Sequence, residues 1–321
     1  MADHSKIEWT DASWNPIRAR REVDGVTRIG WHCEHTSPGC VNCYSEKFNL
    51  AGRSAFTGTR LPYKPGHRKD VEIFLDEKML TQPLRWRSPR KIFVCSMTDL
   101  FGEFVPDWMI DRVLAVAALC RHHILQVLTK RSDRMRRYFA DPEWRVRVAT
   151  LLNELKPGSL WNGNVYQGWQ EIHGKGFIPN VWLGVSVERQ QEADARIPDL
   201  LATPAAVRFL SCEPLLGPVD LNCVADDGDS FIDALRWNPA DSLLGELGKD
   251  GVKGVDWVIV GGESSKNARP MQEEWATPIV DQCRAAGTAC FVKQLGSALH
   301  GKAHKDFDAF PETLKVREFP R

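Results

Sequence analysis

The sequence predicts an α/β fold, specifically a partial or complete parallel βα barrel of the TIM type with insertions. Three observations predict it. Short apolar, β-rich runs recur along all 321 residues, helical segments separate several of them, and most of the runs end in a polar cluster. Continuous apolar runs are typical of strands buried on both faces, as in a parallel sheet, and strands that alternate with helices build βα units.

Seven runs are the predicted strands: residues 7–10, 91–96, 123–129, 181–187, 207–212, 256–262 and 289–294. Residues 106–122 predict a helix with Pro at its start, and residues 271–286 predict another that stops at Gly287. Seven strands over this length favour an open or complete barrel over a sandwich. We therefore expect residues 1–321 to form a single barrel domain.

Three stretches are predicted insertions into this domain. Residues 17–31 resemble a hairpin that precedes a cysteine-rich loop. Residues 141–180 contain a predicted helix at 142–155 and then a loop rich in Gly, Asn and Trp, and residues 222–254 are acidic and Gly-rich. None of the three has the composition of an independent domain.

The charge balance restricts the class of partner. Lys and Arg total 42 and Asp and Glu total 42, so the net charge is zero and a global basic field for nucleic acid is absent. The longest apolar run, Val113–Cys120, is too short to span a bilayer, and the N-terminus lacks a signal-peptide pattern. We expect a cytoplasmic protein with no membrane partner.

Three of the nine cysteines stand apart from the others. An odd number of cysteines without an export signal argues against a disulfide framework. Six are expected to be small buried hydrophobic residues: Cys95, Cys120, Cys212, Cys223, Cys283 and Cys290. Cys33, Cys40 and Cys43 lie within eleven residues of a polar loop, spaced Cys-x6-Cys-x2-Cys, and three thiolates on one loop suit a single metal ion or cluster.

Two kinds of metal centre fit this loop. In a structural zinc site, His32 or His35 would be the fourth ligand, although the chain has no second cysteine knuckle. In an iron–sulfur site, the three cysteines would hold three irons of a four-iron cluster and leave the fourth iron open for a small molecule.

Polar residues end most of the predicted strands, at 96–99, 129–131, 186–188, 211–214, 261–264 and 293–294. In a βα barrel the carboxyl ends of the strands meet at one rim, where active sites are built. Ser96, Thr98, Asp99 and Ser264 have a simpler alternative role as helix caps.

The chain resembles the phage and bacterial three-Cys-motif proteins, a family of largely uncharacterised function that is similar to radical S-adenosylmethionine (SAM) enzymes. The resemblance rests on KIEWTDASWNP, SPGCVNCY, FVCSMTDLF, LTKR, VWLGVSVE, FLSCEPLLGP, WVIVGGES and FVKQLG, which run in order from residue 6 to 296. It implies a barrel of the radical SAM type, a 4Fe–4S cluster on the three cysteines, SAM as cofactor and an electron donor protein as partner.

The resemblance also implies roles for the strand ends. Ser96 and Asp99 would accept hydrogen bonds from the SAM ammonium group, Lys130 or Arg131 would face its carboxylate, and Ser186 or Glu188 would contact the ribose. Gly261 and Gly262 would allow a close approach of the backbone to the adenosine. The remaining catalytic or substrate-contacting candidates are Glu213, Glu263 and Lys293, together with Arg131.

The leading functional hypothesis is therefore a radical SAM-type enzyme that cleaves SAM and abstracts hydrogen from a substrate. The rival is a non-catalytic, zinc-stabilised barrel that binds nucleic acid or a partner protein. Basic segments at 85–91 and 129–137, and the aromatic residues Trp161, Tyr166 and Trp169, favour a nucleic-acid or nucleotide substrate. Solvated surface and the packing of a long loop explain the same residues more simply.

Overall fold

A computed structural model of the chain confirms the α/β prediction. It describes residues 5–52, 58–155, 172, 174, 176–226, 230–237 and 254–320. Seven parallel strands form one sheet in the order β1-β5-β6-β7-β8-β11-β12, with helices interleaved along the chain, so the fold is a partial βα barrel. The chain divides into two compact units, residues 1–36 with 43–182 and residues 37–42 with 183–321.

The first unit holds the strands that begin the sheet. β1 (Ala12–Trp14) pairs in parallel with β5 (Lys91–Val94), which pairs in parallel with β6 (Ile124–Thr129). The core residues of these strands are almost fully buried, as the continuous apolar runs predict.

The prediction of a first strand at residues 7–10 is wrong. The Ile7 carbonyl accepts a hydrogen bond from the Thr10 N–H at 3.2 Å, so these residues form a turn. The Trp9 ring packs on Phe93, with ring centroids 4.8 Å apart, and its burial explains the apolar pattern. The strand forms at β1 instead, where both Ala12 and Trp14 are completely buried.

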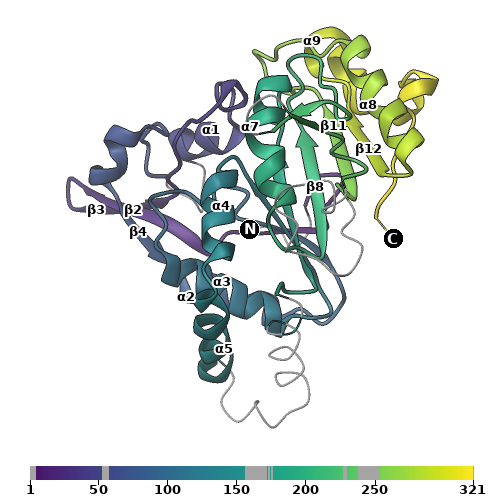
Figure 1. Cartoon of the computed structure of the whole chain (residues 1–321). Helices are drawn as coiled ribbons and strands as arrows, with labels where there is room; N and C mark the ends of the chain where they lie inside the picture. The colour runs from purple at the N-terminus through teal and green to yellow at the C-terminus, as the bar shows by residue number, and fades with distance from the viewer. Residues whose placement is uncertain are drawn as a thin grey trace. The chain divides into compact units, whose positions relative to one another are not determined.

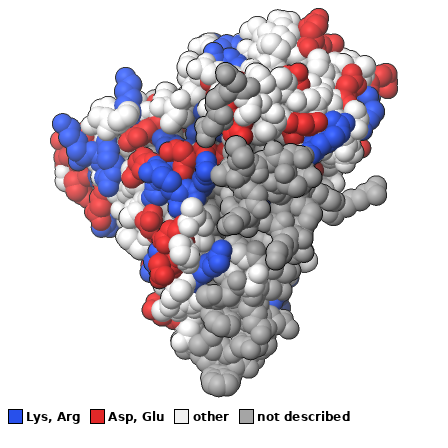
Figure 2. All heavy atoms as spheres, viewed as in Figure 1, with Lys and Arg blue, Asp and Glu red and all other residues white. Residues whose placement is uncertain are grey.

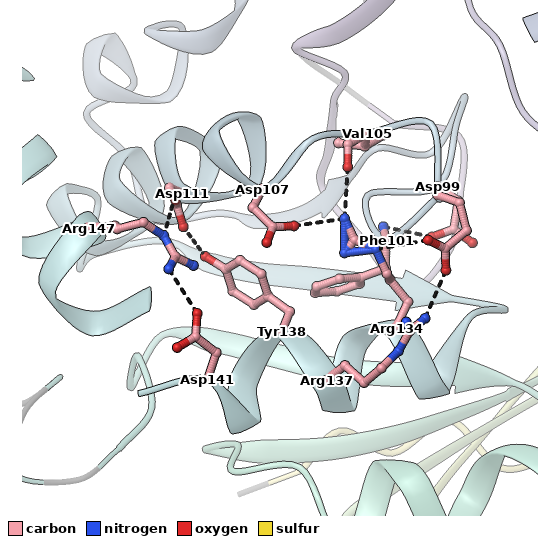
Figure 3. A network of polar contacts seen from close by, with 11 residues as sticks. Asp99, Phe101, Val105, Asp107, Asp111, Arg134, Arg137, Tyr138, Asp141 and Arg147 are labelled. Atoms are coloured by element: carbon pink, nitrogen blue, oxygen red, sulfur yellow. Dashed lines mark hydrogen bonds and ion pairs between the residues drawn. The ribbon is translucent and has the colours of Figure 1, made fainter. Parts of the chain in front are cut away.

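Three helices of the first unit pack together: α3 (Asp107–Leu119), α4 (Ser132–Ala140) and α5 (Glu143–Leu155) (Figure 1). Asp107 in the first turn of α3 complements the positive end of the helix dipole. The buried Asp111 of α3 accepts hydrogen bonds from the Tyr138 hydroxyl of α4 and from the Arg147 guanidinium of α5, and so links the three helices (Figure 3).

Residues 17–31, where a hairpin is expected, form β2 (Ile17–Val23) and β3 (Val26–Gly30), which pair antiparallel. β4 (Glu72–Leu75) pairs with β2 on its other side. The first unit also contains α1 (Tyr44–Ala51), α2 (Glu77–Leu80) and 3-10 turns at Pro65–Asp70 and Pro83–Arg85.

In the second unit, β8 (Val207–Cys212), β11 (Trp257–Gly261) and β12 (Ala289–Gln294) form consecutive parallel pairs. β7 (Val181–Ser186) contains the division between the units. α7 (Gln190–Leu201) lies between β7 and β8 in sequence. α8 (Glu273–Ala286) packs on β11 and β12 and ends at Gly287, whose positive φ of 71° makes it a left-handed cap.

The remaining elements are short. β9 (Val224–Ala225) and β10 (Phe231–Ile232) form an antiparallel ribbon within the predicted 222–254 insertion. α9 (Ser297–His300) and 3-10 turns at Pro38–Cys40, Gly301–Lys305, Phe307–Ala309 and Glu312–Leu314 complete the described part of the unit. Trp161, Tyr166 and Trp169 lie outside the described residues. In the described part of the chain, no helix is long and apolar enough to cross a membrane.

Five of the six cysteines expected in the core are buried, and the sixth is not. Cys223 is exposed because it lies in the turn between Leu221 and β9 rather than inside an element. The prediction that it packs as a small hydrophobic residue is therefore wrong.

Candidate functional site at the strand ends

Asp99 is the centre of a buried hydrogen-bond network after the end of β5. Its Oδ1 accepts from the Phe101 N–H at 3.0 Å and from the Thr129 hydroxyl at 2.7 Å. Its Oδ2 accepts from the Lys130 N–H at 3.1 Å and from the Arg131 guanidinium at 3.0 Å. Both oxygens are therefore engaged by the protein, where the sequence predicts a contact to the SAM ammonium group.

Arg131 connects this network to the cysteine loop. Its Nη2 donates to the carbonyl of Glu34, the residue that follows Cys33, at 3.0 Å. Burial alone would lower the pKa of Arg131, but the charge of Asp99 and the Cys33 sulfur outweigh it and raise that pKa. The positive charge of Arg131 is thus held beside Cys33.

The chain just before Cys33 and the chain just after Cys43 are both hydrogen-bonded to the loop that follows β5. The Thr98 hydroxyl donates to the His32 carbonyl at 2.6 Å, and the Ser45 hydroxyl donates to the Met97 carbonyl at 2.6 Å. The buried Tyr63 hydroxyl also donates to that carbonyl, at 3.1 Å.

Two of the cysteines affect the pKa of Tyr63. Burial, and then the proximity of the Cys33 and Cys43 sulfurs, raise its pKa well above the usual value. Cys33 and Cys43 thus act on Tyr63 electrostatically, and the residues next to them are hydrogen-bonded to the loop that follows β5.

Ser96 and Lys130 lie in the same region of the first unit. The Ser96 hydroxyl accepts from Asn15 Nδ2 at 3.1 Å, and the Ser96 carbonyl accepts from the Tyr44 hydroxyl. The Lys130 N–H is bound to Asp99 and its side chain is half-buried. Their predicted contacts to SAM remain predictions.

In the second unit, Glu188 follows β7 and is completely buried. Its Oε2 accepts from Arg196 Nη1 at 2.8 Å, and its Oε1 accepts from the Ser37 hydroxyl at 2.7 Å. Arg196 Nη1 also donates to the Ser186 carbonyl at 2.8 Å. These contacts hold a protein segment at the place where the sequence predicts a ribose contact.

Glu263, after β11, has a similar environment. Its Oε2 accepts from Asn42 Nδ2 and from the Arg269 N–H, both at 2.8 Å, and its Oε1 accepts from the Arg269 guanidinium. Burial would raise the pKa of Glu263, but the hydrogen bonds from Arg269 and Asn42 outweigh it and lower that pKa.

The two glycines before Glu263 allow close packing within the protein. A Cβ at Gly262 would lie 2.7 Å from the Gly296 Cα, and a Cβ at Gly261 would lie 3.3 Å from the Glu213 carboxyl carbon. The sequence predicts that the backbone at Gly262 lies close to adenosine, and in the structure it lies close to the Gly296 backbone.

Glu213 and Lys293 form an ion pair at the ends of β8 and β12, with 2.6 Å between Lys293 Nζ and Glu213 Oε1. Gln294 Nε2 donates to the same carboxylate oxygen and to the Gly262 carbonyl, both at 2.8 Å. The Gln294 oxygen is buried and has no hydrogen-bond partner among the described residues. This cluster combines a proton donor, a proton acceptor and an unsatisfied oxygen at the ends of β8 and β12.

The two histidines considered as zinc ligands each face a carboxylate. His32 Nε2 lies 3.5 Å from Glu34 Oε1, and His35 Nε2 lies 3.2 Å from Glu46 Oε2. Burial lowers the pKa of His32, which favours its neutral form. Within the described ranges, no group of three or more His, Cys, Asp or Glu side chains is arranged to hold a metal ion.

The basic segment at 129–137 is largely neutralised by carboxylates. Arg134 pairs with Asp107 at 2.8 Å, and Arg137 pairs with Glu103 at 3.0 Å and with Asp133 at 3.1 Å. Figure 3 shows Arg134 also donating to the Val105 carbonyl. On the face drawn in Figure 2, Lys and Arg are interleaved with Asp and Glu. The simpler interpretation of this segment, a solvated and ion-paired surface, fits these contacts.

Comparison with known proteins identifies the family. Residues 4–317 match the family described as "Protein of unknown function (DUF5131)". The chain belongs to the DUF5131 family. No curated protein and no solved structure has significant similarity to it.

Four residues of this DUF5131 chain outside the predicted set of site residues interact with members of that set. Asn42 and Arg269 bind Glu263, Arg196 binds Glu188, and Tyr63 lies beside two of the cysteines. Asn42 is recognisable in sequence only by its place next to Cys43. The other three lie outside the motifs, so no local pattern identifies them.

Proposed function

We propose that this DUF5131 protein is a radical SAM-type enzyme in which Cys33, Cys40 and Cys43 hold an iron–sulfur cluster. The observation that supports it best is the position of Cys33 and Cys43 in the first unit. The residues that flank them are hydrogen-bonded to the loop after β5 and to Arg131 after β6. Carboxyl strand ends are where βα barrels carry their chemistry.

The residue types of the loop, three cysteines, support a cluster here, although their side chains are not gathered into a ready-made metal site among the described residues. None of the three cysteines is in a disulfide in the described part of the chain, and cysteine thiolates are the usual ligands of iron–sulfur clusters. Arg131 would compensate the negative charge of a thiolate-bound cluster and would hydrogen-bond one of its sulfur ligands. Once reduced by an electron donor protein, the cluster would supply one electron for the cleavage of SAM, and the cleaved SAM would supply the hydrogen abstraction from an unactivated C–H bond.

The chain's own residues would then divide the remaining tasks. Asp99 would keep Arg131 charged and oriented toward Cys33, since four donors of the protein engage the Asp99 carboxylate. The half-buried Glu213–Lys293 pair would contact the substrate and is close enough to move a proton between Nζ and Oε1. A zinc centre is less well supported, because the sequence has no second cysteine knuckle of the kind that structural zinc sites usually pair with the first.

The test is anaerobic purification and reconstitution with iron and sulfide. We expect about four irons per chain and a visible absorption band from a 4Fe–4S cluster. Replacing Cys33, Cys40 and Cys43 together by Ala should abolish both, whereas Cys223→Ala, a change at an exposed free thiol, should leave both intact.

Reductive cleavage of SAM by the reconstituted protein, and its loss in the triple variant, is the second measurement. Stoichiometric zinc without iron in anaerobic protein would contradict the proposal and favour the non-catalytic barrel. The expectation of a nucleic-acid substrate has its own test, the salt dependence of oligonucleotide binding.

A further inference from the structure

The segment that carries Cys40 contacts two buried carboxylates. This segment, Ser37–Asn42, belongs to the second unit. Ser37, at one end, binds Glu188, which follows β7, and Asn42, at the other end, binds Glu263, which follows β11. Cys40 lies between these two contacts. Residue separations of 151 and 221 positions make both contacts products of the tertiary fold.

The contact at Glu188 is built tightly. Glu188 is completely buried, and Arg196, whose side chain is 8% exposed, neutralises its charge and leaves Oε1 directed to the Ser37 hydroxyl. A Cβ at Gly39 would lie 2.2 Å from Glu188 Oε1 and under 3 Å from two carbons of the same side chain. Only glycine therefore lets the turn lie against this carboxylate.

The contact at Glu263 is also enclosed by hydrogen bonds. Asn42 Nδ2 donates to Glu263 Oε2 at 2.8 Å and to the Asn267 carbonyl at 3.0 Å. Arg269 binds both carboxylate oxygens, so Glu263 is oriented independently of Asn42. The Asn42 side chain thus contacts a preorganised acceptor.

The segment between the two contacts is itself ordered. The Cys40 N–H donates to the Ser37 carbonyl at 3.0 Å, which closes the short 3-10 turn Pro38–Cys40. One contact would let the segment pivot, whereas contacts at both ends determine where the Cys40 sulfur lies.

We propose that Glu188 and Glu263 are positioning residues that hold the Cys40 segment at both ends, so that Cys40 is presented in a fixed position as a metal ligand. Both carboxylates are engaged by the protein, and their role is therefore to orient this segment instead of binding the cofactor or the substrate. The ligand role of Cys40 rests on the proposed function, but the two contacts do not.

The test measures the reactivity of Cys40 in the full-length, metal-free protein. Iodoacetamide labelling under native conditions, with peptide mass spectrometry, gives a separate rate for each cysteine. Ser37→Ala and Asn42→Ala each remove a hydrogen bond to a charged acceptor. We expect labelling of Cys40 to accelerate about tenfold or more in either variant. Gly39→Ala, which cannot keep the turn against Glu188, should have at least the same effect.

Matched controls separate positioning from general loss of structure. Gly66→Ala and Asn153→Ala should leave the Cys40 rate unchanged, since a Cβ at Gly66 meets nothing within 4 Å and Asn153 is exposed on α5. The buried Cys95 and Cys212 must stay unlabelled in every variant, because their reaction would report unfolding. Ser37→Thr keeps a hydroxyl and should restore the slow rate.

Unchanged Cys40 labelling in Ser37→Ala and Asn42→Ala, with the buried cysteines protected, would overturn the proposal. Equal acceleration at Cys95 would overturn it too, because the effect would then be global. If Cys40 is labelled faster in the variants but the wild type does not bind iron, the positioning of the Cys40 segment is supported and the iron–sulfur cluster is refuted. The two proposals can therefore fail separately. If the wild type binds iron, Ser37→Ala and Asn42→Ala should also retain less of it and shift its absorption spectrum.

Discussion

Replacing Asp99 by Ala should lower the free energy of unfolding by about 3–5 kcal/mol, the cost of removing one partner of a buried ion pair. The side chains of Asp99 and Arg131 are only 8% and 9% exposed, so the guanidinium would keep its charge without a carboxylate beside it. The Thr129 hydroxyl and the N–H groups of Phe101 and Lys130 would also lose their acceptor.

Urea unfolding followed by circular dichroism measures this effect. Arg131→Met removes the charge and keeps much of the side-chain volume, so the double variant with Asp99→Ala should lose less stability than the sum of the single losses. Asp281→Ala is the control, because it breaks an Asp–Arg pair of 2.8 Å whose side chains are 58% and 63% exposed. We expect that control to change stability by about 0–1 kcal/mol.

A loss at Asp99→Ala no larger than that of the control would refute the reasoning. The buried pair would then contribute little to folding, and Asp99 would be released for the other role, binding of the SAM ammonium group. Calorimetry with SAM on the reconstituted Asp99→Ala protein would decide whether that role is real.

Three further outcomes are expected. Tyr138→Phe removes a buried hydrogen bond to Asp111 and should cost about 1–2 kcal/mol in urea unfolding, and no change would show that Arg147 alone satisfies that carboxylate. Gly287→Ala places a side chain at a φ of +71° and should cost about 1 kcal/mol by thermal unfolding, and an unchanged midpoint would contradict this. Burial, and then the neighbouring His122, lower the pKa of His123 from 6.5, so the unfolded chain takes up a proton that the folded protein excludes. The free energy of unfolding should therefore fall as pH drops below 6.5, and it should fall less steeply in His123→Gln. Parallel pH profiles of the two proteins would contradict the assignment of this effect to His123.

The local pattern of apolar and polar residues predicts most of the strands and helices. Six of the seven predicted strands are present within one to two residues of their expected ends, because continuous apolar runs leave little choice but burial on both faces. The helices at 106–122 and 271–286 are present with shorter bounds, and Gly287 is the predicted stop. The first strand was misplaced because burial of Trp9 in a turn produces the same apolar signal as a strand.

The sequence by itself determined the α/β class, the cysteine-rich loop and the polar character of the strand ends. Only the tertiary structure decided what those polar groups bind. Asp99 and Arg131 satisfy one another, and Glu188 and Glu263 hold residues 37–42, through partners that lie up to 221 positions away. A buried carboxylate needs a partner, and whether the protein or a ligand supplies it depends on which distant donors the fold brings within hydrogen-bonding distance.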